Sequence, residues 1–307
     1  MSDHSPAPSS SELARAEDLF ETHRAYLHAI AYRMLGSLSD TEDILQDAFL
    51  RLARVELSEL RQPRAYLSQL VTRLCLDHLR SARVRREHYV GPWLPEPLVD
   101  EAPLASPAAA TVLREDISLA LMFALERLSP LERAAFILHD VFDLDYAEVA
   151  LALGREQAAC RQLAARGRKH VREQRPRFRP SSEESSALLG AFAAAAFGGQ
   201  IDALQRLLTE DVTFVSDGGG KVSAATRVVR GPERVAKLLV GIARKGAEGV
   251  ETTLALVNGQ PGFVQRQGDA IIQAVAIDIR EGRVAGIYGV RNPDKLTHLN
   301  ARAPASD

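Results

Sequence analysis

The chain has 307 residues, of which 46% are hydrophobic and 25% charged, a composition typical of folded globular proteins with two or three domains. A formal net charge of −2 excludes a generic polyanion binder, and a pair of cysteines, Cys75 and Cys160, excludes a disulfide framework and a zinc site made mainly of thiolates. We expect a cytoplasmic protein without membrane contact, because the N-terminus has no signal-peptide pattern and the longest apolar run, 187–197, is too short to cross a bilayer.

Helical periodicity dominates the first part of the chain. Apolar residues recur at helical spacing over 13–31. A second helix is expected to begin with Ser39 or Asp40 as its N-cap, and a third follows Pro63. The first domain is therefore predicted to be all-helical.

Charge is distributed unevenly along these helices. Acidic residues are concentrated over 12–59, whereas 61–86 and 155–179 are rich in arginine. A solvated helix face is the simpler interpretation of one charged block. Two arginine-rich blocks at the ends of helical segments favour surfaces that bind a polyanion.

Proline-rich segments mark the predicted domain boundaries. Several prolines between Gly91 and Pro107 exclude a helix or a central strand there, and 176–186 is a second break rich in proline and serine. The prediction is a first domain over 12–88, a Pro-rich linker over 89–111, a second domain over 112–178 and a third over 183–299.

The sharpest local signal is a helix-turn-helix over 146–163. Ala150 is small where two helices approach closely, and Gly154 suits a left-handed turn. We expect the second helix to carry polar and basic side chains near its start that reach base edges, and basic side chains further along that contact phosphates. The residues are Arg155, Gln157, Arg161 and Gln162, followed by Arg166, Arg168, Lys169 and Arg172.

The third domain has an α+β pattern. Helical stretches over 183–197 and 200–208 precede a series of strand-like runs, and hairpin turns are predicted at Gly268 and Gly282. We expect a curved antiparallel sheet. The runs are 212–216, 225–229, 251–257, 262–267, 270–279 and 283–290.

The helical part resembles a known family. Residues 40–52, 64–80 and 128–154 are similar to the polymerase-clamp helix, the −10-reading helix and the start of the −35-binding domain of group IV (extracytoplasmic-function) bacterial sigma factors. The resemblance implies an alternative sigma factor that binds core RNA polymerase through its β′ clamp and β flap. It also implies binding to the −10 and −35 promoter elements.

The resemblance also implies roles for individual residues. Polymerase binding is expected of Asp40, Glu42, Asp43, Gln46, Asp47 and Leu50. Binding to melted −10 DNA is expected of Arg64, Arg73, Asp77 and Arg80, and binding to the −35 element of the helix-turn-helix residues named above.

The third domain resembles the SnoaL-like members of the NTF2-like superfamily. Three short motifs are similar to those of sigma factors with this extension: 93–98 (WLPEPL), 217–221 (DGGGK) and 292–296 (NPDKL). The fold class implied is multidomain, with two all-α sigma domains and an α+β NTF2-like cone. Interdomain regulatory roles are expected of Trp93, Pro95, Glu96, Asp217, Gly218, Gly219, Gly220, Lys221, Asn292, Pro293, Asp294 and Lys295.

Each motif also has a local structural interpretation that does not depend on the family resemblance. Trp93 in a proline-stiffened segment is expected to be an exposed docking handle. The spacing over 217–221 does not match a phosphate-binding loop, so a tight turn is the simpler interpretation, and Asn292-Pro293-Asp294 is typical of a turn that fixes the tail.

Three hypotheses for the third domain follow. It is a fused regulator that replaces a separate anti-sigma factor and packs on the first domain and the linker. Alternatively, its pocket senses an unknown small ligand. A catalytic pocket has few candidate residues, Asp217, Asp278, Tyr288 and Arg266.

A further alternative is a helix-turn-helix transcription regulator with a ligand-sensing domain. The acidic helix over 40–52 argues against it, because that helix would then have no role. The eight histidines show no metal-ligand spacing, so no metal and no cofactor is expected, and we predict a protein that is not an enzyme.

Overall fold

The computed structural model describes residues 10–87, 89–100, 118–172, 182–245 and 249–301. The chain divides into two compact units, which are considered separately. Unit 1 comprises 1–85 and 125–172, and unit 2 comprises 86–124 and 173–307. Each helix in the described ranges is too short or too polar to span a lipid bilayer.

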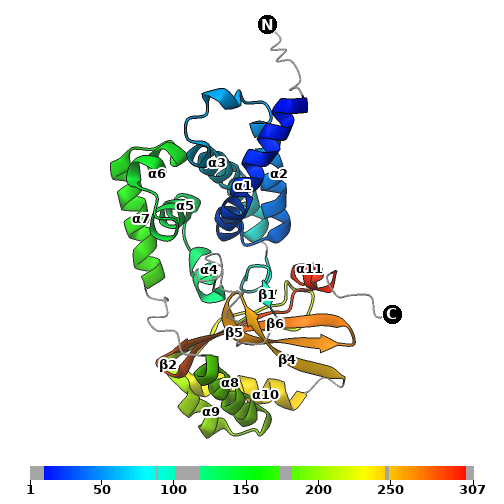
Figure 1. Cartoon of the computed structure of the whole chain (residues 1–307). Coiled ribbons are helices and arrows are strands. Elements are labelled where there is room, and N and C mark those ends of the chain that lie inside the picture. The colour runs from blue at the N-terminus through cyan, green and yellow to red at the C-terminus, as the bar shows by residue number, and fades with distance from the viewer. Residues whose placement is uncertain (1–9, 88, 101–117, 173–181, 246–248, 302–307) are drawn as a thin grey trace. The chain divides into compact units, whose positions relative to one another are not determined.

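Unit 1 begins with three helices, α1 (Ser10–Leu35), α2 (Leu38–Leu52) and α3 (Pro63–Glu87), with a 3₁₀ turn, η1 (Leu57–Glu59), before α3 (Figure 1). Leu27, Ile30 and Leu67 are completely buried in its core. The N-cap of α2 is Ser37, whose side chain accepts from the Asp40 amide, so the prediction of Ser39 or Asp40 as the cap was wrong.

The second part of unit 1 contains α5 (Pro130–Phe136), a π-helical turn η3 (Ile137–Val141), α6 (Tyr146–Leu153) and α7 (Gln157–Arg172). Gly154 has φ +61° and ends α6, which confirms the turn of the helix-turn-helix. Arg155 lies in this turn, before α7 begins, and not on the second helix as predicted.

Unit 2 is a seven-stranded sheet with helices. After α8 (Ser182–Phe197) and α9 (Ile201–Leu207), the strand order is β1-β4-β5-β6-β7-β2-β3 (Figure 1). Strand β2 pairs with β7 in parallel, so the sheet is mixed and not wholly antiparallel as expected. The strands are β1 (Val99–Asp100), β2 (Leu208–Asp217), β3 (Val229–Arg230), β4 (Val250–Val257), β5 (Gln260–Gln267), β6 (Ala270–Arg280) and β7 (Arg283–Val290).

Two further elements differ from the prediction. The run 225–229 contributes only its last residue to a strand, because β3 is Val229–Arg230. A helix that the periodicity analysis missed, α10 (Pro232–Lys245), follows directly. The last elements of the described part of the chain are the 3₁₀ turn η4 (Pro293–Lys295) and α11 (Thr297–Asn300).

Each face of the sheet has its own apolar cluster. The inner cluster joins α8, α9 and α10 to the sheet through side chains such as Phe192, Leu204 and Ile277. The outer cluster joins the sheet to Leu94, Leu119 and Leu296, which come from outside it. The segment predicted as a linker therefore contributes to the core of unit 2, as does α4 (Leu119–Leu125) up to Ala124. Helices on one face of a curved sheet give the predicted α+β cone.

Candidate functional site

A buried carboxylate organises the three motifs of unit 2. Asp217 is the last residue of β2 and is fully buried. Its Oδ1 accepts from the Tyr89 hydroxyl at 2.5 Å and from the Gly219 amide at 3.1 Å. Its Oδ2 accepts from the Leu94 amide at 2.8 Å and from Lys295 Nζ at 2.8 Å. Four donors satisfy a charge that would otherwise be costly to bury.

Lys295 completes this ion pair from the C-terminal turn. It is 7% exposed, and its Nζ also donates to the Leu94 carbonyl. The same ammonium lies 3.8 Å from the centroid of the Trp93 ring and 5.0 Å from that of Tyr89. Trp93 is half-buried under this cation, so the prediction of an exposed indole was wrong.

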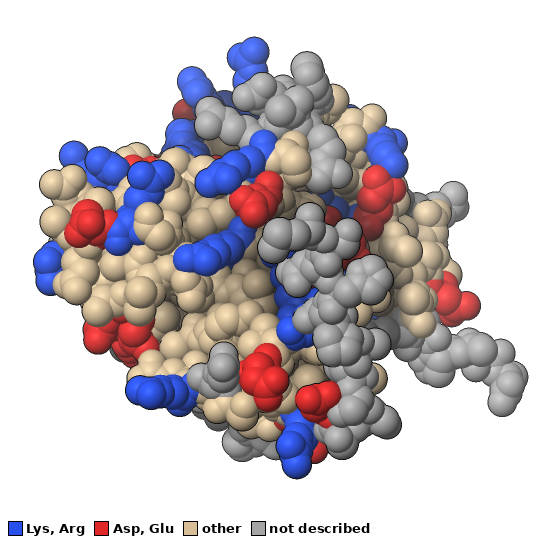
Figure 2. All heavy atoms as spheres, turned by 90° about the horizontal axis from the view of Figure 1, so that it is seen from above, with Lys and Arg blue, Asp and Glu red and all other residues tan. Residues whose placement is uncertain are grey.

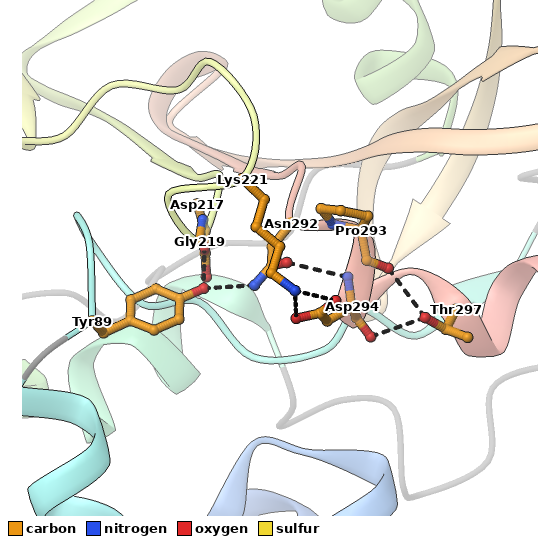
Figure 3. A network of polar contacts seen from close by, with 8 residues as sticks. All are labelled: Tyr89, Asp217, Gly219, Lys221, Asn292, Pro293, Asp294 and Thr297. Carbon is orange, nitrogen blue, oxygen red and sulfur yellow. Dashed lines mark hydrogen bonds and ion pairs between the residues drawn. The ribbon is translucent and has the colours of Figure 1, made fainter.

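Asn292 links the tail to the same network (Figure 3). Its Nδ2 donates to the Tyr89 hydroxyl at 2.9 Å, and its Oδ1 accepts from the Asp294 amide at 3.1 Å, which caps η4 as the predicted turn. Gly219 has φ +59°, and a Cβ there would lie 2.3 Å from Asn292 Nδ2. Lys221 forms an exposed ion pair with Asp294 at 2.6 Å. Gly219 therefore suits both the turn and the close approach of Asn292.

The remaining motif residues lie around this centre. Pro95 is buried and Glu96 half-buried, whereas Pro293 is exposed. A Cβ on Gly218 would lie 2.5 Å from the Val222 carbonyl oxygen, and one on Gly220 would contact Val90 at 3.1 Å. The structure thus brings residues of all three motifs into one network.

Tyr89 belongs to this network and was missed by the sequence motifs. Burial, followed by its hydrogen bond to the Asp217 carboxylate, raises the pKa of the Tyr89 phenol above its usual range. The phenol therefore stays protonated and donates to Asp217 while accepting from Asn292. Its distance of 128 residues from Asp217 along the chain leaves no local signal for this contact.

The acidic face of α2 is largely exposed in unit 1. Asp40 is half-buried, and the imidazole Nε2 of His78 lies 3.3 Å from its Oδ2. Glu42 pairs with Arg24 at 2.6 Å, and Leu50 is 50% exposed. Asp43, Gln46 and Asp47 are exposed on the same helix. This face offers negative charge beside an apolar side chain.

The basic residues of α3 already have partners in unit 1. The Arg64 guanidinium lies 4.2 Å from the Tyr26 ring centroid. Arg73 Nη2 donates to the Leu151 carbonyl of α6 at 3.3 Å. Asp77 and Arg80 form an exposed pair at 3.0 Å.

The residues predicted to bind the −35 element, on α7 and in the turn before it, fall into two groups. Arg155, Gln157, Gln162 and Lys169 are exposed. The others contact neighbouring elements: Arg161 lies over the Tyr146 ring at 5.2 Å, Arg166 pairs with Glu132 at 2.7 Å, and Arg168 pairs with Asp140 at 3.0 Å.

The space-filling view from above shows how charged side chains are distributed over one face of unit 1 (Figure 2). Lys and Arg side chains gather over the part of this face where α6 and α7 lie, with fewer acidic side chains among them (Figure 2). Such a surface attracts a polyanion.

The two halves of unit 1 are joined by a buried arginine. Arg133 of α5 is 3% exposed; its Nη1 donates to the Met34 carbonyl of α1 at 2.7 Å, and its Nε and Nη2 donate to the Leu125 carbonyl. It also pairs with Glu126 at 2.6 Å. Phe142 packs edge-on against Tyr26, 5.1 Å between ring centroids.

The candidate catalytic residues of unit 2 lie on four strands, β2, β5, β6 and β7. Asp278 of β6 is buried beside Arg280 at 3.4 Å, and burial raises its pKa to about 6. Tyr288 of β7 packs against Phe123 with 6.0 Å between ring centroids, and Arg266 is on β5. Within the described ranges, no group of three or more His, Cys, Asp or Glu could hold a metal ion.

Family models match both parts of unit 1. The model of Sigma-70 region 2 matches residues 19–85, and that of Sigma-70, region 4 matches 118–171. The second match includes all of α4, whose residues up to Ala124 belong to unit 2.

Whole-chain relatives extend the likeness to unit 2. The chain is 41% identical over 288 residues to the ECF RNA polymerase sigma factor SigJ of Mycobacterium tuberculosis (strain ATCC 25618 / H37Rv), covering 91% of this chain and 92% of the relative. It is 32% identical over 306 residues to the probable ECF RNA polymerase sigma factor SigI of the same organism, with 98% of each covered. The crystal structure of M. tuberculosis SigJ has a TM-score of 0.73 at 38% identity, covering 91% of this chain and 97% of that one.

Proposed function

The chain belongs to the extracytoplasmic function sigma factor family, and from that premise we propose that its C-terminal sheet unit restrains promoter recognition by holding the linker between regions 2 and 4. As a member of this family the chain is an alternative sigma factor, which acts with core RNA polymerase at promoter DNA. We further propose that it does so in the cytoplasm.

The acidic face of α2 is the proposed contact with the polymerase. Asp43, Gln46, Asp47 and Leu50 are exposed, and this combination of charge and apolar surface suits a basic coiled coil of the β′ subunit. We assign region 4 to the β flap on family resemblance.

The proposed DNA contacts lie on α3 and α7. Exposed Arg155 in the turn, and Gln157 and Gln162 at the start of the recognition helix, suit base edges of the −35 element, and Lys169 suits a phosphate. Arg64 and Arg73 would have to leave Tyr26 and the Leu151 carbonyl to contact −10 DNA.

Promoter binding therefore requires unit 1 to open. Two elements about 25 base pairs apart are separated by about 85 Å of B-DNA. In unit 1, by contrast, Arg133 of region 4 is hydrogen-bonded to Met34 of region 2. The two regions cannot reach both elements while this contact persists.

The network around Asp217 and Lys295 carries the proposed restraint. It fixes Tyr89, Trp93 and Leu94, which lie between the two regions in the chain. Residues 88–118 could span about 100 Å when fully extended, and holding 89–98 on the sheet fixes the course of about 30 Å of that length. Holding the linker thus favours the closed form of unit 1.

The proposal gives unit 2 no catalytic role and no small-molecule ligand. Its inner cluster is formed by apolar side chains, and Asp217 is engaged by Lys295. The alternative of a ligand-sensing helix-turn-helix regulator is not favoured, because it leaves the region 2 match over 19–85 without a function.

Run-off transcription with core polymerase tests the restraint. Leu94 is fully buried, so Leu94→Asp should release the linker and increase transcript yield several-fold. Val90→Asp is the matched control, since Val90 is 55% exposed and nearby in the chain. Equal yields from both variants, with Trp93 fluorescence showing release in Leu94→Asp, would reject the proposal.

A further inference from the structure

We propose that the outer face of the sheet in unit 2 is a binding site for an extended peptide with the Trp-Leu-Pro chemistry of 93–95, and that a free peptide of this sequence displaces the chain's own 89–98. The binding stands apart from the proposed restraint; only its effect on transcription rests on that restraint.

The first support is main-chain recognition at Leu94. Its amide donates to Asp217 Oδ2 at 2.8 Å, and its carbonyl accepts from Lys295 Nζ. Buried side chains therefore form hydrogen bonds with both main-chain groups of Leu94. This pattern suits an extended ligand.

The second support is a matching pair of bonds at Leu98. Its amide donates to Asn258 Oδ1 at 3.0 Å, and its carbonyl accepts from the Asn258 amide at 2.7 Å. Asn258 has φ +51° in the Asn-Gly turn between β4 and β5. His298 Nε2 lies 2.8 Å from the Pro97 carbonyl oxygen.

The third support is that the bound segment covers the polar groups of the site and pairs with them. Asp217 is fully buried, Asn258 is 1% exposed and Lys295 is 7% exposed. Buried polar groups without partners cost free energy, and here the partners of all three include main-chain groups of the bound segment. Asn258 and His298 lie outside the three sequence motifs.

Side chains give the site its selectivity. Leu94 is completely buried in the outer cluster, and Trp93 lies under the Lys295 ammonium. Prolines at 92, 95 and 97 favour the extended backbone before binding, which lowers the entropic cost. The ligand class is thus an extended segment with an aromatic residue, a leucine and flanking prolines.

The effective concentration of the tethered segment sets the concentration of free peptide needed to displace it. A short tether gives an effective concentration in the millimolar range. When the free and tethered ligands have the same sequence, half-displacement occurs near that effective concentration, whatever the intrinsic affinity. A peptide of residues 89–98 should therefore displace the chain's own segment at about millimolar concentration.

The single tryptophan makes the test direct. The full chain, labelled with 5-fluorotryptophan, should give one ¹⁹F resonance at Trp93, which moves to the position of the isolated labelled peptide as unlabelled 89–98 peptide is added. A peptide with the changes W93A and L94D is the control and should leave the resonance unmoved. The chain variant Leu94→Ala should lower the half-displacement concentration at least several-fold.

Two results would overturn the inference. One is a resonance that stays at its bound position up to roughly ten times the millimolar scale in both the wild type and Leu94→Ala. The other is an equal response to the control peptide. A peptide that binds without changing run-off transcription would instead support the site and contradict the restraint.

Discussion

Arg133 of α5 donates from Nη1 to the main-chain carbonyl of Met34 at 2.7 Å, which joins region 4 to region 2 inside unit 1. Its Nε and Nη2 donate to the Leu125 carbonyl. A planar guanidinium reaches both carbonyls at once, which a lysine ammonium cannot do in the same geometry.

Arg133→Lys should therefore favour the open form of unit 1. Dyes on cysteines introduced at exposed Ser58 and Ala158 should report a lower mean transfer efficiency than in the wild type. The native Cys75 and Cys160 are buried and should resist labelling. An unchanged efficiency in a variant with normal helical content would contradict the role given to Arg133.

Reversing one charge on the acidic face of α2 should weaken core polymerase binding. Asp47 is exposed, and we expect Asp47→Lys to lower the affinity about tenfold or more, with the loss decreasing as salt rises. Titration of labelled variants with core polymerase at two salt concentrations measures this. Glu210→Lys, exposed on unit 2, serves as the control; equal affinities for the two variants would remove α2 from the interface.

Two exposed residues of α7 should separate base reading from phosphate binding. Gln162→Ala should cost about 1–3 kcal/mol of discrimination at one −35 position. Lys169→Ala should instead weaken binding to all sequences and reduce the salt slope by about 1. Binding to a panel of −35 variants distinguishes the two. An equal loss of affinity for all −35 variants in Gln162→Ala would show that Gln162 contacts the DNA backbone and not a base.

Asp278 should make unit 2 less stable as pH rises. Burial raises its pKa to about 6, with Arg280 lowering it and Asp211 raising it. The folded state then binds the Asp278 proton more tightly than the unfolded state does. The resulting contribution of Asp278 to the free energy of unfolding is fully present below the unfolded pKa of about 4 and is lost as pH rises through 6.

Replacing Asp278 by asparagine tests whether ionisation of Asp278 destabilises unit 2. Asp278→Asn should raise the thermal midpoint at pH 7.5 by several degrees, corresponding to at most about 3 kcal/mol, and the gain should shrink at pH 5. Arg280 keeps Asp211 as a partner at 3.1 Å. A gain that is equal at both pH values, or larger at pH 5, would refute the argument.

Local patterns in the sequence predicted the elements that local chemistry determines. Gly154 at a left-handed turn, the apolar spacing of α6 and α7, and the turns at Gly268 and Gly282 are all confirmed. Helix α10 was missed although Gly231 and Pro232 mark its start and Arg244 and Lys245 lie in its last turn.

Long-range relations were not predictable from spacing. The parallel pairing of β2 with β7 and the bond between Tyr89 and Asn292, 203 residues apart, depend on how the sheet closes. Motif resemblance pointed to Asp217 and Lys295, but their ion pair emerges only in the structure. The Asn-Gly dipeptide at 258–259 was a usable hairpin signal that the prediction did not exploit.

The restraint itself is tested most directly by run-off transcription with core polymerase and the Lys295→Met variant. This change leaves Asp217 buried without its cation, which typically costs about 3–5 kcal/mol, and removes the contact with Trp93. We predict a several-fold higher transcript yield than the wild type, and a yield nearer the wild type for Lys221→Met, whose ion pair is exposed. A Lys295→Met yield equal to the wild type, from a folded chain whose Trp93 emission shows release, would contradict the account.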